Sequence, residues 1–318
     1  MDQTWSFALT LSTFFSIIIF ILIRVLNQSN PKIRKARPPG PPSLPIIGHL
    51  HKLKQPLHRT LQKFSSQYGP VYSLKFGDRP VVVISSPAAV EECFTKHDVV
   101  LANRPRMLVG KHLNYDWTTI GAASYGPLWQ NLRRVTTLEF FSTTKLNLLT
   151  SIREEEVRAL VKGLFGRGET EFVSVEMRSK FTELTFNIIM RMVTGKRYFR
   201  EETEGFELEE AIAFRGIARD VFELSGATSM VDWLPFLRWV DFQNLEGRML
   251  SVRKNMDGFL DGLIEECRTK RDCRVYEGKR MPLIYTLLNL QESDPENYSD
   301  QIIKGIIMVC IILLPRPD

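Results

Sequence analysis

The uncharged segment from Gln3 to Ile23 constrains this chain more than any other feature of its sequence. It contains no Asp, Glu, Lys or Arg, and positions 14–23 are almost entirely Phe, Ile and Leu. A helix of this length spans about 30 Å, the thickness of the hydrocarbon core of a bilayer. The first basic residues follow the segment and are Arg24, Lys32, Arg34, Lys35 and Arg37. This order predicts a transmembrane anchor over residues 3–26 with the body in the cytosol. A cleaved signal peptide is the alternative, which the order of charges disfavours.

A basic, proline-rich segment over residues 27–48 follows the predicted anchor. Five prolines between positions 38 and 45 fix φ and remove amide donors, so this stretch cannot be helical. We predict a semi-rigid hinge between the membrane and a folded body that begins at residue 49.

The formal charge of +6 does not indicate a nucleic-acid partner. Residues 3–77 hold ten Lys and Arg and no acidic residue, so the rest of the chain is slightly acidic. A nucleic-acid-binding protein carries its positive charge on the folded body. None of the four cysteines forms a C-x-x-C pair, and all five histidines precede position 113, so the sequence predicts no metal site.

The body has the pattern of a mainly α protein with a small β-sheet near its N-terminus. Val71–Phe76 and Val81–Ile84 flank a Gly-Asp-Arg-Pro turn and predict a β-hairpin, and Ser86 before Pro87 predicts the start of a helix. Apolar residues then recur every three or four positions in three stripes, which predict amphipathic helices. The stripes are Leu146, Leu149, Ile152, Val157, Leu160 and Leu164; Phe181, Leu184, Ile188 and Met192; and Leu245, Met249, Val252, Met256, Phe259, Leu263 and Cys267.

Trp129 and Arg133 form the most informative pair in the body. Pro127 can start a helix, on which positions i and i+4 project from the same face. The guanidinium and the indole N–H are donors that suit a carboxylate on a flat ligand. Taken alone, the pair is better explained by cation–π packing on an exposed helix than by ligand binding.

The order of motifs resembles plant microsomal cytochromes P-450, with closest similarity to the isoflavone hydroxylase-like group. The matching segments are PPGPPSLPIIGHL, YGPVYSLKFGDRPVVVISSPAAVEECF, LANRPR, YGPLWQNLRR, LSGATSMVDWLPFLRWVDFQ and SDQIIKGIIMV. The resemblance implies the P-450 fold, a haem cofactor, a small-molecule substrate, and electrons from NADPH-cytochrome reductase. It also implies attachment to the lipid of the endoplasmic reticulum membrane.

The resemblance assigns roles to particular residues. Trp129 and Arg133 would bind the haem propionates. The loop from Arg106 to Gly121 would cover the substrate, and part of one later helix would recognise it. The implied substrate residues are Leu113, Tyr115, Trp117, Phe222 and Ser225.

The family's haem-binding motif, F-x-x-G-x-R-x-C-x-G, does not occur in these 318 residues. Ile302–Leu314 resembles the start of the long helix that continues into A-G-x-[DE]-T, yet Pro315-Arg316-Pro317-Asp318 follows it here. We therefore expect an incomplete P-450 fold over residues 49–318, with no catalytic acid–alcohol pair and no activity as given. The alternative is a membrane-tethered, non-catalytic interaction protein with the same helices.

The segment Val231–Trp239 combines two tryptophans with apolar residues and one arginine. That composition suits a position at the membrane interface, whereas burial of both tryptophans in the core is the competing interpretation.

Overall fold

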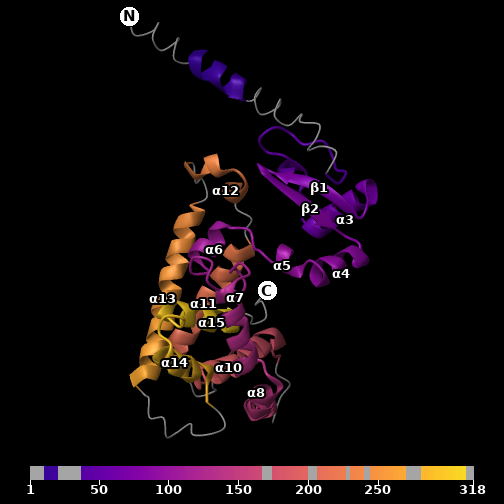
Figure 1. The fold of residues 1–318 in the computed structure, drawn as a ribbon. Helices are drawn as coiled ribbons and strands as arrows, with labels where there is room; N and C mark the ends of the chain where they lie inside the picture. The colour runs from indigo at the N-terminus through magenta and orange to yellow at the C-terminus, as the bar shows by residue number, and fades with distance from the viewer. Residues whose placement is uncertain are drawn as a thin grey trace, which may run out of the picture. The chain divides into compact units, whose positions relative to one another are not determined.

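The computed structural model describes residues 11–20, 37–166, 174–199, 206–226, 230–239, 244–269 and 281–312. They form a mainly helical protein with one two-stranded antiparallel sheet, as predicted (Figure 1). The chain divides into two compact units, one of residues 1–101 and 229–240, the other of residues 102–228 and 241–318.

The described part of the predicted anchor is helical over residues 11–20, and its side chains are exposed. The other residues of the predicted span lie outside the described part of the chain. Among the described residues, no helix is both long enough and apolar enough to cross a membrane. The transmembrane anchor therefore stays a prediction.

Unit 1 is built on the predicted hairpin. Strands β1 (Val71–Phe76) and β2 (Arg79–Ile84) pair in the register Val71 to Ile84 and Phe76 to Arg79. The second strand starts two residues earlier than predicted, because Arg79 and Pro80 complete the ladder. The other elements of this unit are η1 (Leu50–Lys52), α3 (Leu57–Tyr68), α4 (Pro87–Thr95), α5 (Asp98–Leu101), α12 (Met230–Trp233) and η3 (Pro235–Trp239).

The described part of the proline-rich segment packs along β1. The Ser73 amide donates to the Pro39 carbonyl at 2.8 Å, and the Ser73 hydroxyl donates to the Pro38 carbonyl at 2.7 Å. The buried ring of His49 lies 2.9 Å from the Pro41 carbonyl oxygen. This proline-rich stretch is therefore held against the sheet through its carbonyl oxygens, which accept hydrogen bonds. Its proline nitrogens carry no hydrogen and so donate none.

Trp233 packs against the hairpin within unit 1. Its ring meets Phe76 edge-on, with centroids 5.2 Å apart, and the Arg79 guanidinium lies 5.7 Å from its centroid. Phe236 is 57% exposed. Trp233 therefore packs against the hairpin, whereas Phe236 is exposed, and contact of this segment with a membrane stays a prediction. The side chains of Arg238 and Trp239 lie outside the described part.

Unit 2 consists of helices around the long helix α13 (Leu245–Thr269). Figure 1 shows α11 (Phe206–Gly226), α14 (Leu283–Ser293) and α15 (Asp300–Ile312) beside it. The remaining elements of this unit are α6 (Leu108–His112), α7 (Pro127–Val135), η2 (Thr136–Phe140), α8 (Thr143–Leu148), α9 (Thr150–Gly166) and α10 (Met177–Thr194).

The predicted apolar stripe of α13 is confirmed with small changes. Six of its seven residues are buried, and the stripe also includes Leu260 and Ile264. The stripes of α9 and α10 are wrong in part, because Val157 is 44% exposed and Phe181 is 52% exposed. The buried faces there carry polar groups instead, Glu156 and Asn187.

The Glu156 carboxylate joins α9 to α10 and to the segment after it. Its side chain is only 2% exposed, and it accepts hydrogen bonds from Arg191 Nη1 at 2.7 Å and from Arg197 Nε at 2.9 Å. Asn187 Nδ2 lies 3.3 Å from the same carboxylate and donates to the Phe199 carbonyl at 2.7 Å. A buried charge with this many donors holds these segments in one arrangement.

We expect Glu156→Gln to lower the free energy of unfolding by about 3 kcal/mol, because it removes the buried negative charge that lies between the Arg191 and Arg197 guanidinium groups. The matched control is Glu154→Gln on the same helix, where the carboxylate is 59% exposed and pairs with Arg158. That change should cost less than about 0.5 kcal/mol. Urea unfolding followed by circular dichroism measures both, and equal losses would contradict the role of Glu156.

Asp300, at the start of α15, pairs with α13. Burial alone would raise the pKa of Asp300, but hydrogen bonds from Gln291 and Arg268 and the charges of Arg268 and Lys304 hold this pKa below its ordinary value. The Arg268 Nη2 to Asp300 Oδ1 distance is 2.5 Å. The carboxylate therefore stabilises the folded state only when ionised.

A lowered folded-state pKa contributes stability above the unfolded pKa of about 4 and loses it as the pH falls through the lowered value. Asp300→Asn should therefore be less stable than the unmodified chain at pH 7, and the difference should shrink below about pH 4. Urea midpoints measured across this range test it, with Glu296→Gln as the exposed control. A difference that does not change with pH would refute the assignment.

Candidate functional site

Helix α7 carries the predicted Trp129–Arg133 pair. Pro127 occupies its first turn, as predicted, and the helix buries Leu132 and Val135. Trp129 is half-buried and Arg133 is exposed. The helix therefore presents the pair toward solvent while its other face enters the core of unit 2.

The two side chains stack on each other. The Arg133 guanidinium carbon lies 5.3 Å from the centre of the Trp129 ring. The indole N–H is already used, since it donates to the Ile120 carbonyl at 3.2 Å. The cation–π arrangement is thus present, and Trp129 acts as a platform that supports the guanidinium from one side.

The Arg133 guanidinium fits the carboxylate edge of a ligand such as haem. Among the described residues, no carboxylate lies within ion-pairing distance of this exposed guanidinium. Its neighbour Arg134 donates to Asn131 Oδ1 at 2.8 Å instead. A stacked guanidinium with free donors is suited to binding a carboxylate through two parallel hydrogen bonds.

Burial keeps one of the described cysteines, Cys310, in its thiol form. Cys267 and Cys310 are buried and Cys93 is half-buried. Burial raises the pKa of Cys310 to about 12, so its sulfur is a thiol at neutral pH. Coordination as a thiolate requires the opposite shift. Within the described part of the chain, no cluster of three or more His, Cys, Asp or Glu side chains is arranged to hold a metal ion.

The predicted substrate residues of the loop after α6 lie inside unit 2. Leu113 and Tyr115 are each 1% exposed. Trp117 is half-buried, and its indole N–H donates to the Met107 carbonyl at 3.2 Å. The Arg106 guanidinium carbon lies 5.2 Å from the Trp117 ring centre. The loop is thus well anchored, and contact of these residues with a substrate stays a prediction.

Tyr115 is engaged with charged residues of α13 and α15. Its hydroxyl donates to Asp257 Oδ1 at 2.8 Å, and the Lys304 ammonium lies 5.9 Å from the ring centre. Lys304 also pairs with Asp257 at 3.2 Å and with Asp261 at 3.1 Å. Burial first, and then the hydrogen bond to Asp257, raise the pKa of the Tyr115 hydroxyl, so it remains a donor at neutral pH.

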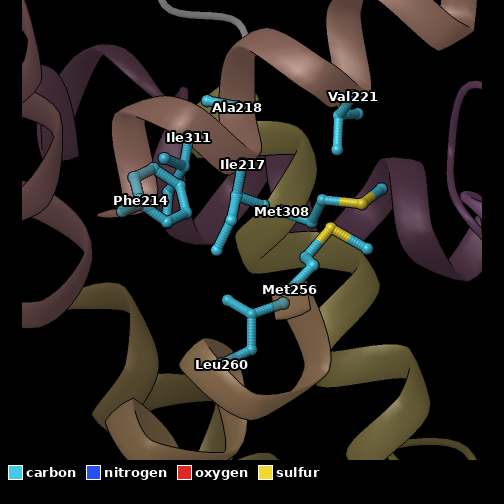
Figure 2. A pocket seen from close by; sticks show the side chains of 8 residues that line it. All are labelled: Phe214, Ile217, Ala218, Val221, Met256, Leu260, Met308 and Ile311. Carbon is cyan, nitrogen blue, oxygen red and sulfur yellow. The ribbon is translucent and has the colours of Figure 1, made fainter. Parts of the chain in front are cut away.

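The predicted recognition residues Phe222 and Ser225 lie in the last turns of α11. Phe222 is half-buried and Ser225 is exposed. Neither lines the apolar pocket that α11 forms with α13 and α15 (Figure 2). That pocket is lined by Phe214, Ile217, Ala218, Val221, Met256, Leu260, Met308 and Ile311.

Sequence reasoning missed both the α11 side of this pocket and the charged cluster around Tyr115. Phe214, Ile217, Ala218 and Val221 recur at helical spacing, which marks one face of α11. Arg253, Asp257 and Asp261 are spaced by four, so they share one face of α13. These patterns would have identified the two helix faces, but they do not show which element packs against each face.

Comparison with known proteins gives a consistent result. The sequence model of the cytochrome P-450 family matches residues 38–312. Isoflavone 2'-hydroxylase of Glycyrrhiza echinata is 46% identical over 304 residues, which cover 96% of this chain and 59% of the relative. Isoflavone 3'-hydroxylase of Medicago truncatula is 47% identical over 295 residues, covering 92% and 58%. The (+)-piperitol/(+)-sesamin synthase of Sesamum radiatum is 43% identical over 298 residues, covering 92% and 57%.

The chain spans about three fifths of the length of these curated relatives. Within that span, the family model covers nearly all of the described body, including both residues of the stacked pair. On this match and these identities, the chain belongs to the cytochrome P-450 family, and its similarity is to plant enzymes of the isoflavone hydroxylase type.

Proposed function

We propose that this chain supplies the haem-edge and substrate-side part of a monooxygenase that hydroxylates a small phenolic plant metabolite. The observation that carries the proposal is the exposed Arg133 guanidinium, which stacks on Trp129 and has no carboxylate partner among the described residues. The names of two relatives, isoflavone 2'- and 3'-hydroxylase, support the substrate class and the reaction.

Arg133 is the residue that would hold a haem carboxylate, by donating two N–H groups to its oxygens. Trp129 supports the guanidinium, and the Ile120 carbonyl fixes the indole in the plane that this stacking needs. When bound with a thiolate ligand, haem supplies the activation of O2, with electrons from NADPH-cytochrome reductase. Leu113, Tyr115, Trp117, Phe222 and Ser225 are the proposed substrate-side residues.

None of the four cysteines lies in the family's haem-binding motif. We therefore propose that these 318 residues alone do not hold haem stably, although Arg133 would contact its carboxylates. A contact at one edge of the cofactor is weak compared with coordination of the iron, because only a charge-assisted pair near solvent remains.

A carbon monoxide difference spectrum tests this proposal. We expect no thiolate-type band from the 318-residue chain, and a band when it is extended with the C-terminal part of an isoflavone hydroxylase relative. In the extended protein, Arg133→Leu should reduce haem occupancy by about tenfold, the loss expected for one charge-assisted bidentate contact.

Arg134→Leu is the matched control, because Arg134 is the neighbouring arginine and its guanidinium is bound to Asn131. It should leave haem occupancy unchanged. A thiolate-type band from the 318-residue chain, or equal losses in the two arginine variants, would contradict the proposal.

We also propose that residues 3–26 attach the protein to the endoplasmic reticulum membrane, with the body in the cytosol. Deletion of residues 1–24 should release most of the chain from carbonate-washed microsomes, since the uncharged segment is its main apolar contact with lipid. Asn297, which is exposed and followed by Tyr298-Ser299, reports the orientation. Its glycosylation on microsomes would place the body in the lumen and refute the proposed orientation.

A further inference from the structure

Three consecutive residues after α6 adopt left-handed backbone conformations. Their φ values are 50° at Tyr115, 56° at Asp116 and 59° at Trp117. None of them is glycine, and two have bulky rings, for which this region is unfavourable. Such a turn persists only where surrounding contacts hold it, and turns of this kind are concentrated at ligand clamps and switch regions.

Tyr115 holds the start of this turn against two helices. Its hydroxyl donates to Asp257 of α13, and its carbonyl accepts a hydrogen bond from Gln301 Nε2 of α15 at 2.9 Å. The Arg253 guanidinium carbon lies 5.2 Å from its ring centre. Side chain and backbone of the same residue are therefore fixed by different helices.

Trp117 holds the end of the turn against α6. Its indole N–H donates to Met107, and its ring lies directly against Gly110, where any Cβ would collide with it. Its amide donates to the Gly110 carbonyl at 2.9 Å. Contacts therefore hold the turn at both of its ends.

The residues that follow lead directly to the stacked pair of α7. The Thr118 hydroxyl donates to the Tyr115 carbonyl at 2.6 Å, and the Thr119 hydroxyl donates to Asn114 Oδ1 at 2.9 Å. Thr119 also packs near Gly305 of α15, since a Cβ there would lie 3.3 Å from its methyl group. The next residue is Ile120, whose carbonyl accepts the Trp129 indole N–H.

We propose that Tyr115 is a positioning residue that fixes the Ile120 carbonyl and, through it, the orientation of the Trp129 indole beneath Arg133. It does so by holding the left-handed turn against α13 and α15. The significance of this link for a haem edge rests on the proposed function, whereas the link itself is a property of the cofactor-free chain.

Because the link needs no cofactor, it is tested on the full 318-residue chain in lipid nanodiscs without haem. Two readouts are used: hydrogen exchange of the amides of residues 116–121, and the ¹⁹F resonance of Trp129 in protein labelled with 5-fluorotryptophan. Trp129→Phe assigns that resonance. Both readouts are obtained without haem, so they stay available even if the chain does not bind haem. A failure of this proposal can therefore be told apart from a failure of the proposed function.

Tyr115→Phe removes only the hydroxyl. We expect exchange of these amides to accelerate by roughly three- to tenfold, the effect of losing one buried hydrogen bond, and the Trp129 resonance to shift or broaden. Tyr72→Phe is the matched control, because Tyr72 is fully buried and its hydroxyl also donates over 2.8 Å, to the Leu61 carbonyl in unit 1. It should change neither readout.

Gln301→Ala is the second variant, since it removes the side chain that holds the Tyr115 carbonyl while leaving the tyrosine in place. It should likewise accelerate exchange of the amides of residues 116–121 and shift or broaden the Trp129 resonance. If Tyr115→Phe does not fold, this variant alone tests the proposal. Unchanged exchange in the folded variants would overturn the proposal. Faster exchange with an unmoved Trp129 resonance would overturn it too, because the turn would then not control the indole.

Discussion

The pairing of α13 with α15 through Lys304 is the interaction on which the rest of unit 2 depends. The Lys304 side chain is only 14% exposed, and its ammonium group lies within 3.2 Å of both Asp257 and Asp261. Burying a lysine is unfavourable unless its charge is matched, so α15 is held in the one register where both carboxylates meet it. The same Asp257 accepts the Tyr115 hydroxyl, which joins the loop after α6 to this pair of helices.

The loop after α6 is linked in turn to the exposed side of α7. The Ile120 carbonyl holds the Trp129 indole, and the indole supports the exposed Arg133 guanidinium. The proposed cofactor contact is thus placed by residues distant in sequence and not by α7 alone. This explains why the tryptophan donor is already used internally, leaving the arginine as the donor available to a ligand.

The sequence predicted the features that depend on local physics. The hairpin, the Ser86 cap, whose hydroxyl accepts from the Ala89 amide at 3.1 Å, and the long stripe of α13 follow from turn chemistry and periodicity. Periodicity failed at α9, where the charged Glu156 is buried and Val157 is exposed. Hydropathy cannot indicate that two arginines, 35 and 41 residues further along the chain, will surround that carboxylate.

For the candidate site, spacing placed Trp129 and Arg133 on one face, but it could not show that the indole binds Ile120. The most direct measurement is an experimental structure of this chain joined to the remainder of a P-450 fold and loaded with haem. We expect Arg133 nitrogens about 2.8 Å from a haem carboxylate, with the indole still bound to the Ile120 carbonyl. A structure in which Arg133 faces solvent and other residues hold both carboxylates would contradict it.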